Sequence, residues 1–258
     1  MEEIIEILER RGFFIDKIDG KYYLSDNALL ITKYKRGIPV GTVDNSDEEF
    51  LDQLLRNAGV GYLGEDLEII VTDNSPQKIE DEINRKGKHN AISASQGTGW
   101  LMVKNYRQTS KFPVAWLEIN VARYVKVLNA IGVFTYLCCG GHKKKGGMSP
   151  LIVEFDNEIY AAFMKLLWDE VLIKKFPLEW KWENNKSSFA LMEDMQKKCD
   201  ILNDAAKYIY ENRRYFQDLR MDSMKWMTRS ISRHTTDKEK LERFLGEVKK
   251  RLEMECEN

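Results

Sequence analysis

The spacing of apolar residues changes at Asn185, and this change limits the folds open to the chain. Before it, short extended patterns alternate with helical ones, which is typical of a sheet packed against helices. After it, apolar residues recur every three or four positions along 189–209, and Thr236 with Glu239 three positions later marks the start of a last helix. We therefore expect an α+β fold with a central mixed sheet and flanking helices, a small N-terminal sheet region and a helical C-terminal region.

Local signals predict the individual elements. Strands flank the Asp19-Gly20 turn within 13–24 and are expected again at 67–71, 133–139 and 150–155. Helices are expected at 2–11, 46–58, 76–85, 116–130 and 157–171. The elements suggest an N-terminal α+β region (1–75), a central α/β basic region (76–185) and a C-terminal helical region (186–258), which together form one compact unit.

The hydrophobic pattern and the cysteine spacing predict the cellular compartment. The chain contains no run of eighteen apolar residues, and its acidic start, MEEIIEILERRGFF, differs from a secretory signal. Cys138 and Cys139 are adjacent, while Cys199 and Cys256 lie in helical patterns, so the four cysteines do not form the spaced framework of a secreted disulfide protein. We expect a cytoplasmic protein with reduced thiols and no membrane contact.

Positive charge is concentrated in the middle of the chain. The whole sequence has a formal net charge of -1, yet between Ile83 and Val153 the only acidic residue is Glu118. A basic region between acidic flanks favours an anionic ligand, a nucleotide or a nucleic acid, although a solvated basic face is an alternative. A polar segment follows residue 84. In it and just beyond it, we expect these residues to contact the ligand: Arg85, Lys86, Lys88, His89, Lys104 and Arg107.

The stretch TYLCCGGHKKKGG, residues 135–147, is the strongest candidate site. It follows an expected strand, and glycine lets the backbone N–H groups of Gly140 and Gly141 approach a bound anion. The three lysines that follow, Lys143, Lys144 and Lys145, suit a phosphate. The chain has neither a GxxxxGK[ST] nor a GxGxxG motif, so the prediction rests on this glycine and lysine pattern. A basic, flexible surface turn is the alternative.

Cys139 and His142 form a C-x-x-H pair within the same stretch. Zinc needs three or four ligands, and the neighbouring lysines would oppose a cation, so we predict no metal site. If the chain is an enzyme, Cys139 and His142 are the candidate catalytic residues, and the modification of RNA or of a nucleotide is the expected reaction. No cofactor can be named from these residues.

The string GVFTYLCCGGH resembles a pattern G-hydrophobic-x-T-x-x-S-C-x-G-H that recurs in uncharacterised phage and bacterial proteins. Leu128, Asn129, Gly132, Thr135, Cys139, Gly141 and His142 match it, and Cys138 stands in place of the serine. More distantly, the segment is similar to the T-x-x-S-C-x-G-R motif of the wybutosine-synthesis domain, a SAM-dependent tRNA-modifying family, in which arginine stands where this chain has His142. The resemblance covers residues 115–155 and implies a nucleic-acid or nucleotide substrate.

A second class of function stays open. The chain could be a noncatalytic interaction protein of phage type that sequesters a nucleotide signal or blocks a host protein. The C-terminal helices would then supply the surface for a protein partner.

Overall fold

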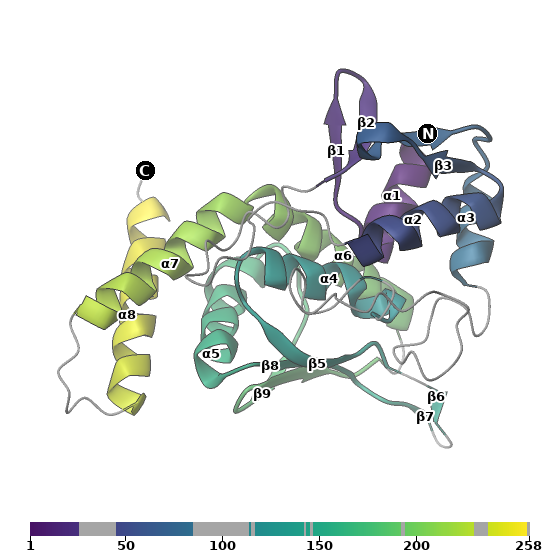
Figure 1. Cartoon of the computed structure of the whole chain (residues 1–258). Coiled ribbons are helices and arrows are strands. Elements are labelled where there is room, and N and C mark those ends of the chain that lie inside the picture. The colour runs from purple at the N-terminus through teal and green to yellow at the C-terminus, as the bar shows by residue number, and fades with distance from the viewer. Residues whose placement is uncertain are drawn as a thin grey trace.

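The protein is described here by a computed structural model that covers residues 1–25, 45–84, 114, 117–141, 143–144, 147–191, 194–229 and 237–256. These residues form both helices and antiparallel sheets, which confirms the α+β class. In Figure 1 the N-terminal elements lie at the upper right, the largest sheet lies at the bottom, and the last two helices form the left end.

The N-terminal elements share a hydrophobic cluster of their own. Ile4, Leu8, Leu51 and Leu54 are fully buried in it. Gly12, in the left-handed conformation that glycine adopts without strain, ends the first helix and turns the chain into the hairpin about Asp19 and Gly20. The elements of this part are α1 (Glu2–Arg11), β1 (Ile15–Ile18), β2 (Lys21–Leu24), α2 (Asn45–Ala58), β3 (Gly61–Leu63), a 3₁₀ turn (Glu65–Leu67), β4 (Ile69–Val71) and α3 (Pro76–Ile83).

The central sheet has the strand order β5-β8-β10-β9, and each described pairing in it is antiparallel. Residues in β8 alternate, with Leu151, Val153 and Phe155 buried on the face that packs against helices. A small hairpin, β6 with β7, follows β5 and extends from the sheet at the lower right of Figure 1. The strands are β5 (Thr135–Cys139), β6 (Lys143–Lys144), β7 (Gly147–Met148), β8 (Leu151–Phe155), β9 (Lys181–Glu183) and β10 (Lys186–Phe189).

A second hydrophobic cluster joins this sheet to the remaining helices, so the central and C-terminal regions share one core. Phe163 of one helix lies against Phe244 of the last helix, with ring centroids 6.0 Å apart. The helices are α4 (Ile119–Ala130), α5 (Glu158–Leu167) continued by a π-helical turn (Trp168–Leu172), α6 (Met195–Glu211), α7 (Arg213–Arg229) and α8 (Asp237–Cys256).

Two details differ from the sequence-based expectation. The sheet was expected to be mixed, whereas its described pairings are all antiparallel. The rule that ligands lie at the carboxyl ends of parallel strands therefore lends no support to a site at the end of β5. The residues 186–189 form β10 and not the start of a helix, because this strand pairs with both β8 and β9. The polar segment after residue 84 lies outside the described residues.

A buried ion pair connects the two parts of the molecule. The Lys126 Nζ of α4 lies 2.6 Å from the Asp47 Oδ2 of α2, and the two side chains are only 5% and 9% exposed. The other oxygen of Asp47 accepts a hydrogen bond of 2.6 Å from the backbone N–H of Val114. One carboxylate therefore fixes the start of α2, the middle of α4 and the chain at residue 114.

We expect Asp47→Ala to lower the free energy of unfolding by about 3–5 kcal/mol, because it leaves the buried ammonium of Lys126 and the N–H of Val114 without this carboxylate. The matched control is Asp169→Ala, which removes an ion pair with Lys165 whose side chains are both 51% exposed. This control should change the free energy by no more than about 0.5 kcal/mol. Urea denaturation measures the free energy of unfolding of both variants. Equal losses would contradict the stabilising role of the buried ion pair.

Candidate functional site

The backbone of Gly140 is held on both sides by the first turn of α4. The carboxylate of Glu118, the N-cap residue of that helix, accepts a hydrogen bond from the Gly140 N–H. The side-chain amide of Asn120 donates to the Gly140 carbonyl oxygen at 3.0 Å. A side chain at this position would meet the Glu118 Cβ and Oε2 at 2.9 Å and the Asn120 Cβ at 3.3 Å. Only glycine fits here, and the turn after β5 is fixed to α4.

Gly141 continues the turn in the left-handed region, with a φ of 81°. A side chain on it would overlap the Leu191 side chain and lie 2.9 Å from the Ser149 carbonyl oxygen. Two residues later the chain enters β6, where Lys143 pairs with Met148 and Lys144 with Gly147. The hairpin that contains the two lysines therefore begins at a closely packed glycine pair.

The described geometry changes one expectation about this turn. Gly140 was predicted to offer its N–H to a bound anion, but this N–H is donated to the carboxylate of Glu118. Gly140 therefore sets the path of the chain, and its own N–H is engaged by an acid. The predicted roles of Lys143 and Lys144 stay predictions, since only their backbone is described.

The two adjacent thiols have different surroundings. Cys138 is buried, and burial together with the charge of Glu118 raises the pKa of its thiol to about 12. It is protonated at neutral pH and cannot act as a thiolate nucleophile there. Cys139 is half-buried at the end of β5. The catalytic role predicted for Cys139 with His142 stays a prediction, because His142 lies outside the described residues.

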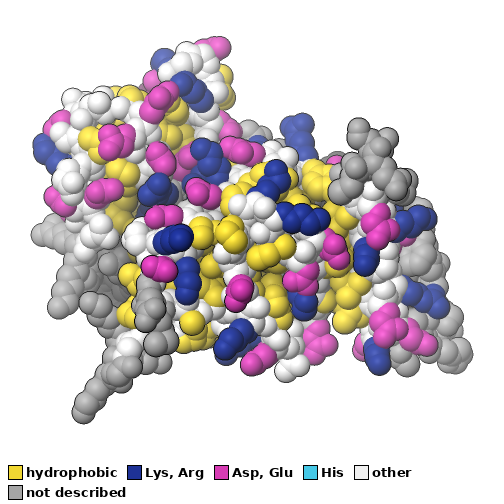
Figure 2. Space-filling view, turned by 180° about the vertical axis from the view of Figure 1, so that it is seen from behind, with side chains coloured by type: hydrophobic (Ala, Val, Ile, Leu, Met, Phe, Trp, Pro, Cys, Tyr) yellow, Lys and Arg dark blue, Asp and Glu magenta, His cyan; other side chains and the backbone are white. Residues whose placement is uncertain are grey.

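Two of the central basic residues are neutralised inside the protein. Arg123 is paired with Glu9 of α1 at 3.1 Å, and Lys126 is paired with Asp47. Burial lowers the pKa of Arg123, and Glu9 opposes this effect. These two cations hold α4 against the N-terminal helices and are not part of a ligand-binding surface. On the face shown in Figure 2, basic and acidic side chains alternate among apolar ones, without an area of a single sign among the described residues.

The remaining predicted contact residues lie outside the described residues. They are Arg85, Lys86, Lys88, His89, Lys104, Arg107 and Lys145. The structure does place the two ends of the segment that contains most of them. The segment leaves α3 after Asn84 and returns at Val114, whose N–H is bonded to Asp47.

A surface pocket that the sequence did not predict lies among α1, α3, α4 and α6. Its volume is about 250 Å³. Four apolar residues line it, Ile7, Ile83, Ile119 and Cys199, and of these Ile83 and Cys199 are buried. Burial and the charge of Asp200 raise the pKa of the Cys199 thiol to about 11, so the thiol is protonated at neutral pH. The sequence signal was weak, because the pocket combines residues from four elements far apart in the chain.

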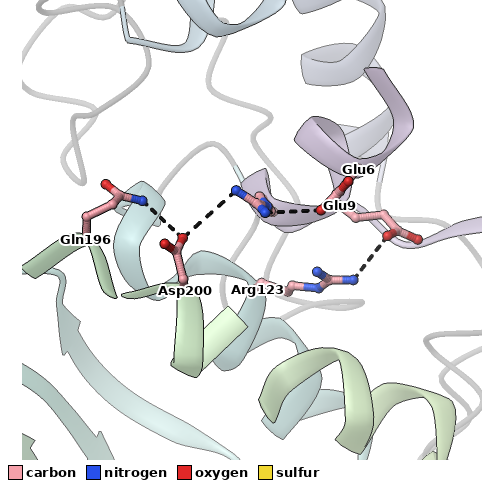
Figure 3. A network of polar contacts seen from close by, with 6 residues as sticks. Glu6, Glu9, Arg123, Gln196 and Asp200 are labelled. Atoms are coloured by element: carbon pink, nitrogen blue, oxygen red, sulfur yellow. Dashed lines mark hydrogen bonds and ion pairs between the residues drawn. The ribbon is translucent and has the colours of Figure 1, made fainter. Parts of the chain in front are cut away.

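A network of polar contacts forms one wall of this pocket, and Figure 3 shows Gln196 and Asp200 of α6 pointing toward one another. The side-chain amide of Gln196 donates to the Asp200 Oδ1 at 3.0 Å, and the Arg10 Nη1 lies 3.9 Å from the same oxygen. Arg10 also contacts the Glu6 carboxylate of its own helix at 3.1 Å. Asp200 is therefore held in position from two sides.

The pocket adjoins the glycine turn. Asn120 lines the pocket and also donates its amide hydrogen bond to the Gly140 carbonyl oxygen. Asn84, the last described residue before the basic segment, also lines the pocket. The glycine turn and the end of α3 thus both adjoin the pocket.

Comparisons with known proteins give no relative. No protein-family model, no curated protein and no solved structure matches the chain. The resemblance of 115–155 to phage proteins and to the wybutosine-synthesis domain therefore stays a prediction from the residues that carry it.

Two further features concern the described residues alone. Within the described ranges, His, Cys, Asp and Glu side chains do not gather in a group of three that could hold a metal ion. Over the same residues, each helix is too short or too polar to cross a bilayer.

We expect Gly140→Ala to lower the free energy of unfolding by about 1–3 kcal/mol, because the added methyl group must displace Glu118 or Asn120. The control is Gly246→Ala in α8, where an added Cβ meets nothing within 4 Å. That change should stabilise the protein by about 0.5–1 kcal/mol, since alanine favours a helix more than glycine does. Thermal unfolding compares the two, and a neutral Gly140→Ala would show that the turn is loosely packed.

Proposed function

We propose that the chain binds the phosphate of a nucleotide or a nucleic acid at the hairpin β6–β7 and the turn that precedes it. The observation that carries the proposal is the double hydrogen bonding of Gly140 to Glu118 and Asn120. It fixes the base of a hairpin in which Lys143 and Lys144 occupy paired backbone positions. A site whose backbone is ordered before binding loses less conformational entropy when the ligand arrives.

The positions of the acidic residues support the proposal. Between 83 and 153 the sequence contains one acid, Glu118, and its carboxylate is bonded to the backbone of Gly140. The acids that reach α4 from the N-terminal part, Glu9 and Asp47, are paired with Arg123 and Lys126. The described carboxylates near the turn are thus engaged in internal contacts, which supports a role of the lysine triplet in attracting an anion.

The proposal includes a cytoplasmic location and no catalytic step. Cys138, Cys139 and Cys199 are free thiols, which suits a reducing compartment where nucleotides and RNA are the common phosphate ligands. The described residues near the turn offer a protonated Cys138 and the half-buried Cys139. The proposal therefore concerns binding alone, and the catalytic role of Cys139 with His142 stays a prediction.

The test is binding of a fluorescein-labelled 20-nucleotide single-stranded RNA and of adenosine 5′-monophosphate at several salt concentrations. We expect replacement of Lys143, Lys144 and Lys145 by Glu to weaken binding of both ligands at least tenfold. For the RNA, each lost phosphate contact lowers the slope of log affinity against log salt by about 0.7, so the slope should fall by about two.

The control makes the same change of charge elsewhere. Lys174, Lys181 and Lys250 are exposed residues in other parts of the molecule, and their replacement by Glu should leave binding nearly unchanged. Equal losses in the two triple variants would mean that only net charge matters. Absence of binding of both ligands to the unaltered chain would also contradict the proposal.

A further inference from the structure

We propose that the pocket among α1, α3, α4 and α6 binds the nucleoside part of a nucleotide, with the phosphate directed toward the glycine turn and the hairpin β6–β7. This inference rests on the proposed function for the position of the phosphate. The nucleoside part is uncharged and rich in hydrogen-bonding groups, and the pocket has the matching size, charge and chemistry.

The size of the pocket limits its occupant. Ligand pockets usually measure roughly 300–1,000 Å³, so a pocket of about 250 Å³ suits one small group and not a chain of nucleotides. Proteins that bind single strands stack successive bases on aromatic side chains. The described lining residues include no aromatic side chain, and the apolar part consists of three isoleucines and Cys199. These residues can pack against the flat face of a single base.

The charge of the pocket argues against a phosphate inside it. Among the described lining residues, Arg10 is the one cation, and Glu80 and Asp200 are anions. Arg10 already contacts both Glu6 and Asp200. An uncharged ligand that donates hydrogen bonds fits this wall better than an anion, because carboxylates only accept hydrogen bonds.

Several polar groups of the wall lack a partner among the described residues. Both contacts of Asp200 fall on Oδ1, so its Oδ2 is available to accept a hydrogen bond from a ribose hydroxyl or a base amino group. The side-chain amide of Asn203 makes no hydrogen bond within the described part of the chain and lies one turn along the same face of α6. An amide both donates and accepts, as recognition of a base edge requires.

The pocket adjoins the turn that leads to the hairpin. Asn120 lines the pocket and lies 3.0 Å from the Gly140 carbonyl oxygen, measured from its amide nitrogen. Lys143 follows Gly140 by three residues, and three residues of extended chain span at most about 10 Å. In Figure 1 α3 lies at the upper right of the molecule and the hairpin β6–β7 at the lower right.

The experiment is calorimetric titration of the full chain with adenosine, guanosine, cytidine and uridine, and with their 5′-monophosphates, at low and high salt. We expect at least one nucleoside to bind with an affinity that salt does not change, because an uncharged ligand releases no counterions. Its 5′-monophosphate should bind about tenfold or more tightly, as a charge-assisted hydrogen bond to phosphate would give.

Two variants test the pocket from different elements. Asn203→Phe on α6 and Asn84→Phe after α3 each fill the pocket, and each should abolish nucleoside binding. Glu211→Phe places the same bulk at an exposed position of α6 and should leave binding unchanged. Thermal unfolding checks that the variants are folded. Binding retained in both pocket variants, or no binding of any nucleoside, would overturn the inference.

The outcomes separate this inference from the proposed function. If the monophosphates bind, and if their binding requires Lys143–Lys145 but is unchanged by Asn203→Phe, the phosphate site stands and the pocket inference fails. If nucleosides bind and are lost with Asn203→Phe, but the Glu replacements at Lys143–Lys145 change nothing, the pocket stands and the proposed function fails.

Discussion

The buried carboxylate of Asp47 is the interaction on which the arrangement of this protein depends. It binds the ammonium of Lys126 in the middle of α4 and the backbone N–H of Val114 at the return of the basic segment. A buried charge is costly unless it is paired, so the three parts of the chain it joins are strongly held to one another. Because α4 is fixed in this way, its first turn has a defined position beside the sheet.

The first turn of α4 in turn positions the candidate site. Glu118 and Asn120 hold the two backbone groups of Gly140, and Asn120 also lines the pocket. The same short segment therefore connects the buried core, the glycine turn and the pocket. A substitution of Asp47 in the core would therefore alter the position of α4 and, through it, the geometry of the site.

Local signals in the sequence were sufficient for most helices and for several strands, and insufficient for the site. The helix at 2–11, the helix expected at 116–130 and found at 119–130, and the hairpin about Asp19 follow from apolar spacing and turn residues, which act within a few positions. Strand β10 was missed because its pairing with β8 and β9 is a tertiary contact, and the spacing from Phe189 onward resembles a helix. Glu118 was noticed only as the single acid of a basic region. Its bond to Gly140 depends on how α4 packs beside β5, and the sequence pattern carries no such information.

Hydrogen–deuterium exchange with and without the four nucleoside 5′-monophosphates tests the central claim most directly, namely that one ligand spans the glycine turn and the pocket. The account predicts slower exchange at 118–120, at 138–141 and along 196–203 of α6 when the ligand is bound, with little change in α7 and α8. Protection confined to α7 and α8, or protection of the turn without any change in α6, would contradict it.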